Sequence, residues 1–516
     1  MFIKHPLIRE NSIDEREYQI ALANSCLESS TLIVLPTGMG KTVVALVVMA
    51  KTLENKKGKV VFLAPTKPLV EQHSKFVREH LVGKKVVALT GEVEPAEREV
   101  AWIENDIIVS TPQVVANDLR SERISLRDVK LIIFDEAHRG VGNYAYVAIG
   151  EEYKAYDGLV MGMTASPGSS GRRIEDVCRN LGIVKTEVRS ESDPDVAKYV
   201  QDVNMQWVEV DVPDQMRKVS NILRSLNDSY IKELVSLGVM DSKRPPSRKY
   251  LLEVRSRIQN KLDSGERRRQ LYRALSVQAM AMKIGHALEL GETQGTTALT
   301  SYLERMVTEA TSEDGSKASR AIVRSPEFEK IISLLGSMKM EHPKLSRVMS
   351  IVSNQIIAHP NSRILVFTHY RDTCELVANK LSKIEGAKVA KLIGQAERGS
   401  DKGLKQKEQV GVLEKFRRGE NNVLVATSVG EEGLDVASTD LVVFYEPVPS
   451  EIRTIQRRGR TGRRSPGRVV IMITRGTMDE AYLYSSQKKE TAMRRRLYKL
   501  SEKDEKKKAS ENHDEK

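Results

Sequence analysis

The sequence has few of the residues that would indicate a secreted or membrane-bound protein. Its three cysteines, Cys26, Cys178 and Cys374, lie far apart and form no CxxC pair, which is typical of a reducing, intracellular setting. The longest apolar run, Val43–Ala50, is much shorter than the ~20 residues of a membrane span. No apolar stretch follows the charged residues at the N-terminus, so a signal peptide is not expected. We predict a cytoplasmic protein with no membrane partner.

The charge balance is moderately basic, because 82 Lys and Arg residues stand against 70 Asp and Glu residues, a formal net charge of +12. A basic protein gains affinity for a polyanion when its cations replace condensed counterions. An ordinary solvated basic surface would give the same balance, so the charge by itself does not decide for nucleic acid. The length of 516 residues and the hydrophobic content of 40% indicate a soluble globular protein of about three domains.

Hydrophobic patterning divides the chain into two strand-and-helix regions separated by a helical one. In the outer regions short β-branched runs alternate with amphipathic segments, as in parallel sheets covered on both faces. In the middle region apolar residues recur at helical spacing beside clusters of Lys and Arg,. The sequence therefore predicts an α/β fold of two parallel-sheet domains with an all-helical insert. The predicted parts are domain 1 (1–212), the insert (213–340), domain 2 (341–477), a basic C-terminal helix (478–500) and a disordered charged tail (501–516),.

A glycine-containing loop follows the first expected strand, Thr31–Leu35, and precedes an apolar helix. This is the context of a phosphate-binding loop, in which glycines permit a tight turn and backbone N–H groups face the phosphates. Lys41 would reach the β- and γ-phosphates of ATP, and the Thr42 hydroxyl would hold Mg²⁺. A plain glycine turn into a helix would not need Lys-Thr at its end. The expected nucleotide-binding residues here are Pro36, Thr37, Gly38, Met39, Gly40, Lys41 and Thr42.

Two further segments would complete the chemistry of ATP hydrolysis. Residues 135–138, DEAH, end the apolar strand Leu131–Phe134, and a strand end directs carboxylates into the crevice where ligands bind in such folds. We expect Asp135 to contribute to Mg²⁺ binding and Glu136 to orient and deprotonate the attacking water. In the third region Arg460 and Arg463 lie three residues apart and would act as arginine fingers. A basic patch for nucleic acid is the alternative for this segment.

In type and order these motifs resemble those of superfamily 2 helicases and translocases, which have two RecA-like domains. The resemblance covers most of residues 14–475. It implies that Thr66, Lys67, Thr111 and Thr427 contact the nucleic-acid backbone. It implies that His138, Thr164 and Ser166 couple hydrolysis to movement. It also implies nucleotide contacts from Gly433, Asp435 and Gln456, with Arg16 stacked on the adenine and Gln19 paired with its edge. Ordinary helix surface is the alternative for the last two residues.

Three features indicate a branch of this superfamily. The motif at 456–463 begins with Gln456, a long helical insert separates the sheet domains, and residues 64–70 read APTKPLV. Together they most resemble the archaeal Hef and Fanconi anaemia M-type helicases, whose insert is thumb-like and grips duplex near a branch. Arg267, Arg268 and Arg269 in the insert are the expected contacts. Many Hef proteins continue into a nuclease with an ERKxxxD motif, which this sequence lacks, so no nuclease activity is expected.

The resemblance implies an ATP-dependent DNA helicase or translocase that acts on forks and Holliday junctions in repair and stalled-fork processing, with ATP and Mg²⁺ as cofactors. A sliding clamp or a repair nuclease is a candidate protein partner, and in a prokaryote the protein would associate with the nucleoid. The RIG-I-like and Dicer-type enzymes, which bind double-stranded RNA, share the layout, so an RNA-dependent ATPase is the alternative. An inactive scaffold is a third reading, but every residue needed for hydrolysis is present.

Overall fold

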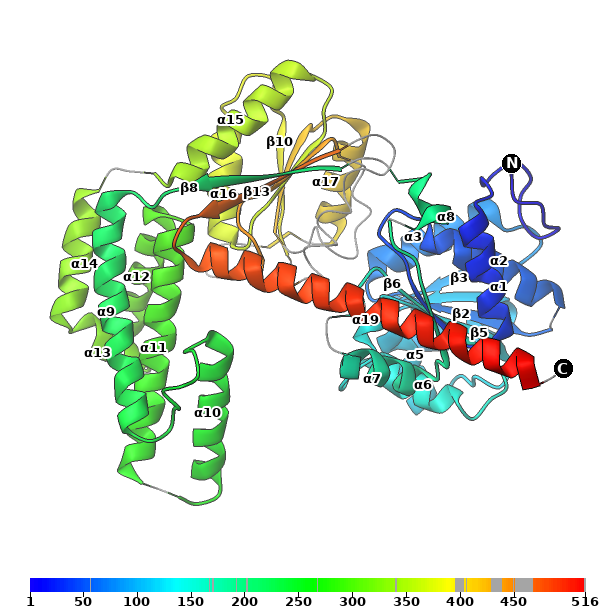
Figure 1. The fold of residues 1–516 in the computed structure, drawn as a ribbon, viewed down its shortest axis with the longest axis horizontal. Helices are drawn as coiled ribbons and strands as arrows, with labels where there is room; N and C mark the ends of the chain where they lie inside the picture. Colours follow the sequence, from blue (N-terminus) through cyan, green and yellow to red (C-terminus); the bar gives the residue numbers. More distant parts are fainter. Residues whose placement is uncertain are drawn as a thin grey trace.

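The computed structural model has three parts (Figure 1): a sheet domain that contains the N-terminus, a helical bundle at the opposite end of the molecule, and a second sheet domain between them. The predicted α/β fold of two parallel-sheet domains with an all-helical insert is confirmed. The structure describes residues 1–55, 57–166, 168, 171–191, 193–200, 203–266, 268–338, 341–394, 403–404, 406–427, 439–448, 450 and 467–514.

The first sheet is parallel throughout its seven strands, which lie in the order β3-β4-β2-β5-β6-β1-β7. Apolar residues of its strands are buried on both faces, against α1–α3 on one and α4–α7 on the other. The strands are β1 Thr31–Val34, β2 Lys59–Leu63, β3 Val86–Leu89, β4 Ile107–Ser110, β5 Val129–Asp135, β6 Leu159–Thr164 and β7 Lys185–Val188. The helices are α1 Glu17–Glu28, α2 Lys41–Asn55, α3 Lys67–His80, α4 Pro95–Glu104, α5 Pro112–Arg120, η1 Ala137–Arg139, α6 Ala145–Tyr153, α7 Gly171–Leu181 and α8 Pro194–Ala197.

The helical bundle forms around its own apolar core. Serine caps begin α10 and α14: Ser247 accepts a hydrogen bond from the Tyr250 N–H, and Ser325 accepts one from the Phe328 N–H,. The bundle comprises α9 Asp214–Ser236, α10 Arg248–Asp263, α11 Arg269–Thr293, α12 Thr296–Thr311, α13 Lys317–Val323 and α14 Pro326–Ser337.

The second sheet is also parallel, in the order β10-β11-β9-β12-β13-β8. Its edge strand β8 pairs with β13 along Val203–Val210, although the predicted first domain extends to residue 212. The alternating apolar and polar residues of β8 suit an edge position in either sheet, so sequence could not assign it. The elements are β8 Val203–Val210, α15 Pro343–Ala358, β9 Ile364–Phe367, α16 Arg371–Leu381, β10 Val389–Leu392, α17 Gln406–Arg418, β11 Val423–Ala426, β12 Leu441–Phe444 and β13 Gly467–Thr474.

One long helix, α19 (Met478–Asp514), follows the second sheet and crosses to the first domain (Figure 1). The helix extends to Asp514 and so includes most of the segment 501–516 for which the sequence predicts disorder. The segment is rich in Lys and Glu, which favour a helix even without an apolar face. Among the described residues, no helix is long and apolar enough to cross a bilayer.

Candidate functional site

The predicted phosphate-binding loop lies between β1 and α2 and has the backbone such a loop needs. Gly38 and Gly40 have φ angles of 87° and 78°, in the left-handed region that glycine adopts without strain. A Cβ on Gly40 would also collide with the Nε2 atom of Gln19. The Lys41 ammonium donates to the carbonyl oxygens of Leu35 at 2.9 Å and Pro36 at 3.4 Å. The loop thus forms a tight cradle with a lysine at its rim.

The two residues expected at the adenine lie beside this loop. Gln19 is 2% exposed, and its Nε2 donates to the Met39 carbonyl at 3.1 Å, which Tyr18 Oη also contacts at 2.7 Å. Its Oε1 is buried without a hydrogen-bond partner among the described residues. Such an orphaned acceptor suits the exocyclic amine of an adenine. The Arg16 guanidinium lies 4.8 Å from the centre of the Tyr199 ring, and its stacking on the adenine stays a prediction.

The acidic pair at the end of β5 is held in a defined geometry. Asp135 is 6% exposed; its Oδ1 accepts the Glu136 N–H at 3.0 Å and its Oδ2 lies 2.9 Å from His73 Nε2. Glu136 has φ 49° and ψ 49°, a left-handed conformation that costs a residue with a Cβ about 1 kcal/mol or more. Backbone strain of this kind concentrates at functional sites, and here it falls on the residue predicted as the base.

The three residues expected to couple hydrolysis to movement are brought together behind this pair. His138 Nδ1 lies 3.2 Å from Glu136 Oε2 and 3.1 Å from Thr164 Oγ1 at the end of β6. The Ser166 N–H donates to the same Thr164 hydroxyl at 3.1 Å. A continuous series of polar contacts therefore joins Glu136 to Ser166 through a buried histidine and a buried threonine.

The residues expected on nucleic acid follow the carboxyl ends of strands. Thr66 and Thr111 precede α3 and α5, after β2 and β4, and Thr427 follows β11 and is 5% exposed. Lys67 forms an ion pair with Glu92 at 2.8 Å, which ties its segment to the turn after β3. Helix N-termini such as those after Thr66 and Thr111 suit phosphate oxygens.

The remaining predicted residues divide into two groups. Arg268 and Arg269 are exposed at the start of α11, and Arg268 pairs with Glu266 at 3.2 Å. The others lie outside the residues that the structure describes: Arg267, Gly433, Asp435, Gln456, Arg460 and Arg463. For the described residues, no group of three His, Cys, Asp or Glu side chains is placed to hold a metal ion. Mg²⁺ needs no such cage, since it binds with one or two carboxylates, water and substrate phosphates.

Sequence reasoning missed two buried residues that contact Asp135. His73 lies on the apolar face of α3 with Val70 and Val77, and that periodicity was the available signal. The Tyr146 hydroxyl donates to the carbonyls of Asp135 at 2.6 Å and Leu63 at 3.1 Å. Burial, and then the nearby Asp135 carboxylate, raise the pKa of Tyr146 well above 10. It therefore stays protonated and joins the ends of β2 and β5.

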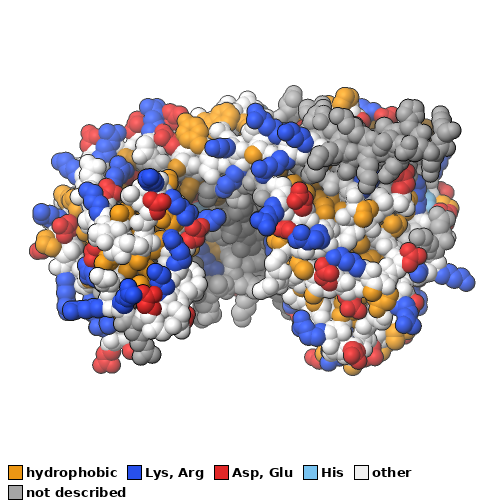
Figure 2. Space-filling view, turned by 60° about the horizontal axis from the view of Figure 1, so that its bottom comes forward, with side chains coloured by type: hydrophobic (Ala, Val, Ile, Leu, Met, Phe, Trp, Pro, Cys, Tyr) orange, Lys and Arg blue, Asp and Glu red, His pale blue; other side chains and the backbone are white. Residues whose placement is uncertain are grey.

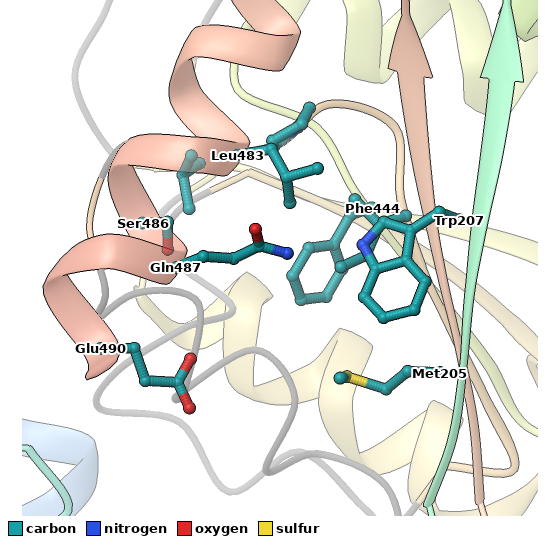
Figure 3. A pocket seen from close by; sticks show the side chains of 10 residues that line it. Met205, Trp207, Phe444, Leu483, Ser486, Gln487 and Glu490 are labelled. Atoms are coloured by element: carbon teal, nitrogen blue, oxygen red, sulfur yellow. The ribbon is translucent and has the colours of Figure 1, made fainter. Parts of the chain in front are cut away.

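The helix α19 links this site to the rest of the molecule. It packs on the second sheet through Leu483, and its Tyr482 hydroxyl donates to Glu289 in α11 at 3.0 Å. Farther along, Met493 is buried in the core of the first domain. Between these contacts a small hollow opens under the helix (Figure 3), where Gln487 extends toward Phe444 and Trp207 of the sheet. Its volume of about 50 Å³ is far too small for a nucleotide.

Comparisons with known proteins match the three parts in order. The DEAD/DEAH box helicase family matches residues 16–173, and the helicase conserved C-terminal domain matches residues 344–465. Residues 215–342 match a helical bundle described, provisionally, as that of an ATP-dependent RNA helicase. The crystal structure of the Pyrococcus furiosus Hef helicase domain is 46% identical, with a TM-score of 0.70, and the match covers 93% of this chain and 100% of that one. The chain belongs to the Hef-type helicases of superfamily 2.

Two curated relatives extend this result. A protein of Methanocaldococcus jannaschii, provisionally named an ATP-dependent RNA helicase, is 38% identical over 96% of this chain. The ATP-dependent DNA helicase mph1 of Neurospora crassa is 32% identical over 90% of it. The Hef-type chain spans 62% and 41% of the lengths of these two relatives. ATP binding and ATP-dependent helicase activity follow from the helicase domains.

Proposed function

We propose that this chain is the motor of a DNA helicase that uses Mg·ATP to remodel branched DNA, forks and four-way junctions, during repair and stalled-fork processing. The observation that carries the proposal is the basic, exposed face of the helical insert. A relative of the chain, mph1, is named a DNA helicase. Contacts to the backbone carry little base information, so the motor would select structure rather than sequence.

The nucleotide half of the proposal assigns a role to each group around the cradle. Lys41 binds the β- and γ-phosphates, while Thr42 and Asp135 are the groups that would hold the metal. Bound Mg²⁺ supplies charge neutralisation on the phosphates. Glu136 orients the attacking water and takes its proton. The contacts from Glu136 through His138 and Thr164 to Ser166 give a route by which a change at the phosphate reaches the rest of the domain. Arg460 and Arg463 are proposed as fingers from the second domain.

The DNA half of the proposal rests on the insert. In α10 the apolar face, with Leu251, packs into the bundle core, while Lys249, Arg255 and Lys261 are exposed. Figure 2 shows a hollow between the bundle and the first domain, with Lys and Arg side chains on both rims. Cations on both sides of a groove suit a duplex, which has phosphates on both strands.

A second candidate is an ATPase that depends on double-stranded RNA. The provisional names of the Methanocaldococcus jannaschii relative and of the helical-bundle family both specify RNA helicases. The two candidates differ in one measurable property, the nucleic acid that accelerates ATP turnover most. ATPase rates with single-stranded, duplex, forked and four-way DNA, and with the RNA equivalents, distinguish them. Stronger stimulation by duplex RNA than by forked DNA would contradict the proposal.

Variants make this experiment specific to the proposed sites. Lys41→Ala removes the ammonium at the cradle and should abolish turnover, whereas Lys51→Ala, farther along α2 and bonded to Asn24, should not. Reversing Lys249, Arg255 and Lys261 to Glu should weaken fork binding, and each lost phosphate contact should lower the slope of log affinity against log salt by about 0.9. Lys330→Glu, exposed on α14 of the same bundle, is the control for charge.

A further inference from the structure

His73 occupies an unusual position for a polar side chain. It is 4% exposed, and its ring stacks on Phe62 of β2 with centroids 4.5 Å apart. Its Nε2 lies 2.9 Å from Asp135 Oδ2. Its Nδ1 is buried and has no hydrogen-bond partner among the described residues. Because a carboxylate can only accept, Nε2 carries a proton and donates it to Asp135. Nδ1 then remains a buried polar atom that makes no hydrogen bond to the described residues.

If His73 only filled space in the core, its unpaired ring nitrogen would lower stability without any compensating benefit. Burying an imidazole nitrogen without a partner costs free energy, and an apolar side chain would stack on Phe62 without that cost. The hydrogen bond to Asp135 is the one polar contact of the His73 ring that the described residues provide. The position of the ring is therefore best explained by what it does to Asp135.

The same histidine belongs to the helix that begins at the expected nucleic-acid contacts. Thr66 and Lys67 lie at the start of α3, and His73 follows about two turns later, ~10 Å along the axis. Val70 and Val77 on either side of it are fully buried, so α3 is packed as a rigid element on the sheet. A displacement of the helix at its N-terminus would reach the Asp135 carboxylate through His73.

We infer that His73 is a positioning residue for the metal site: it holds the Asp135 carboxylate in the orientation that binds Mg²⁺ and ties that carboxylate to the helix that carries Thr66 and Lys67. The inference rests on the proposed role of Asp135. One oxygen of Asp135 is fixed by the Glu136 N–H and the other by His73, and each keeps a second lone pair for the ion or its water. Such outer contacts set the affinity of metal ligands, and losing one costs about 10-fold or more.

Two nearly isosteric variants separate this role from simple packing. In His73→Gln the amide nitrogen can take the place of Nε2 and donate to Asp135, whereas in His73→Asn the shorter amide cannot reach it. His73→Leu keeps the contact with Phe62 and removes the hydrogen bond. Val77→Ala, in the same helix and away from Asp135, is the control for a loosened core. All are measured below the lowest melting temperature of the set.

The first readout is the Mg²⁺ concentration that gives half-maximal ATPase activity. The second needs no turnover: it is the difference in melting temperature between the protein with ADP and Mg²⁺ and the protein with ADP alone. We expect His73→Asn and His73→Leu to need about 10-fold more Mg²⁺ and to lose most of the Mg²⁺-dependent rise. We expect His73→Gln and Val77→Ala to resemble the wild type. Equal Mg²⁺ requirements in the Gln, Asn and Leu variants would overturn the inference.

The Asp135→Asn variant distinguishes a failure of the proposed function from a failure of this inference. If Asp135→Asn left the Mg²⁺ requirement unchanged, the assignment of Asp135 would be wrong, and the inference would fall with it. If Asp135→Asn raised the requirement while His73→Asn and His73→Leu did not, Asp135 would keep its role and only the positioning by His73 would be rejected.

Discussion

The Ser166 hydroxyl lies 2.9 Å from the Met493 sulfur, although 327 positions separate the two residues in the chain. Ser166 follows β6 of the first domain and belongs to the series of contacts that begins at Glu136. Met493 belongs to α19, which starts beside the second sheet and contacts the bundle through Tyr482. The helix therefore joins all three parts of the molecule and meets the first one at a residue predicted to couple hydrolysis to movement.

The first prediction concerns this contact. Met493 is 3% exposed, and Met493→Ala would leave a cavity in the core of the first domain, at a cost of about 2–5 kcal/mol in the free energy of unfolding. The loss should appear in urea or thermal unfolding. Because α19 is also held at its other end, we expect the variant to fold and to show weaker stimulation of its ATPase by DNA. Tyr484→Ala, 66% exposed on the same helix, should change neither property.

The second prediction concerns the start of the same helix. Lys344 and Asp479 form an ion pair with side chains 0% and 1% exposed, and Asp479 also accepts the Thr474 N–H at 2.9 Å. Lys344→Ala would leave the buried Asp479 carboxylate without its charged partner and should lower the free energy of unfolding by about 3–5 kcal/mol. The double variant Lys344→Met, Asp479→Leu should cost less than the Lys344→Ala change, because no unpaired charge remains. A double variant that unfolds more readily would show that the pair itself contributes net stability.

Most of the fold could be predicted because central strands are buried on both faces and therefore appear as continuous apolar runs, as in Leu131–Phe134,. The strands β7 and β8, which lie at sheet edges, do not form such runs. There a strand such as β8 alternates apolar and polar residues, a weaker signal that does not say which sheet it joins.

The candidate site also has a part that sequence predicts and a part that it does not. The phosphate-binding loop is local in sequence, so its glycines, lysine and threonine could be identified from spacing alone. The contact of His73 with Asp135 joins residues 62 positions apart, and that of Ser166 with Met493 joins residues 327 apart. No local pattern relates such pairs, because they are set by which elements the sheet brings together. What sequence could show was a polar residue on an apolar helix face.

The third prediction is a pH dependence at the start of α15. Burial, and then the Lys344 ammonium, lower the pKa of His342 from 6.5 to about 3. Between pH 6.5 and about pH 3 the imidazole of His342 binds a proton in the unfolded chain but not in the folded chain. Acid therefore favours unfolding. Within this window each pH unit should lower the free energy of unfolding by up to about 1.4 kcal/mol.

The variant His342→Asn tests this assignment. The His342 Nδ1 accepts the Lys344 N–H at 3.2 Å as the cap of α15, and an asparagine oxygen can take over that acceptor without binding a proton. The melting temperature of the wild type should fall more steeply than that of the variant as the pH drops below 6.5. Parallel curves would mean that other groups account for the acid sensitivity.

The fourth prediction concerns a buried arginine beside the expected nucleic-acid contacts. Arg98 in α4 donates from Nε and Nη2 to both oxygens of Asp118 in α5, each at 2.7 Å, and Nη1 donates to the Val93 carbonyl. It thereby joins the turn that contains Glu92, the ion-pair partner of Lys67, to the helix that follows Thr111. A lysine is a point charge that cannot make this planar, two-pronged contact.

Arg98→Lys should therefore keep the charge but release the turn. We expect the DNA concentration for half-maximal ATPase stimulation to rise about 10-fold, the equivalent of ~1.4 kcal/mol, with little change in the KM for ATP, because Arg98 does not contact the cradle around Gly38–Thr42. Arg123→Lys is the matched control: its guanidinium lies 3.5 Å from the same Asp118 but is 40% exposed, so its pair contributes about 1 kcal/mol or less. If Arg98→Lys raised the KM for ATP as much as the DNA requirement, the residue would support the whole domain rather than the nucleic-acid face, and the two sites would be less separable than their geometry indicates.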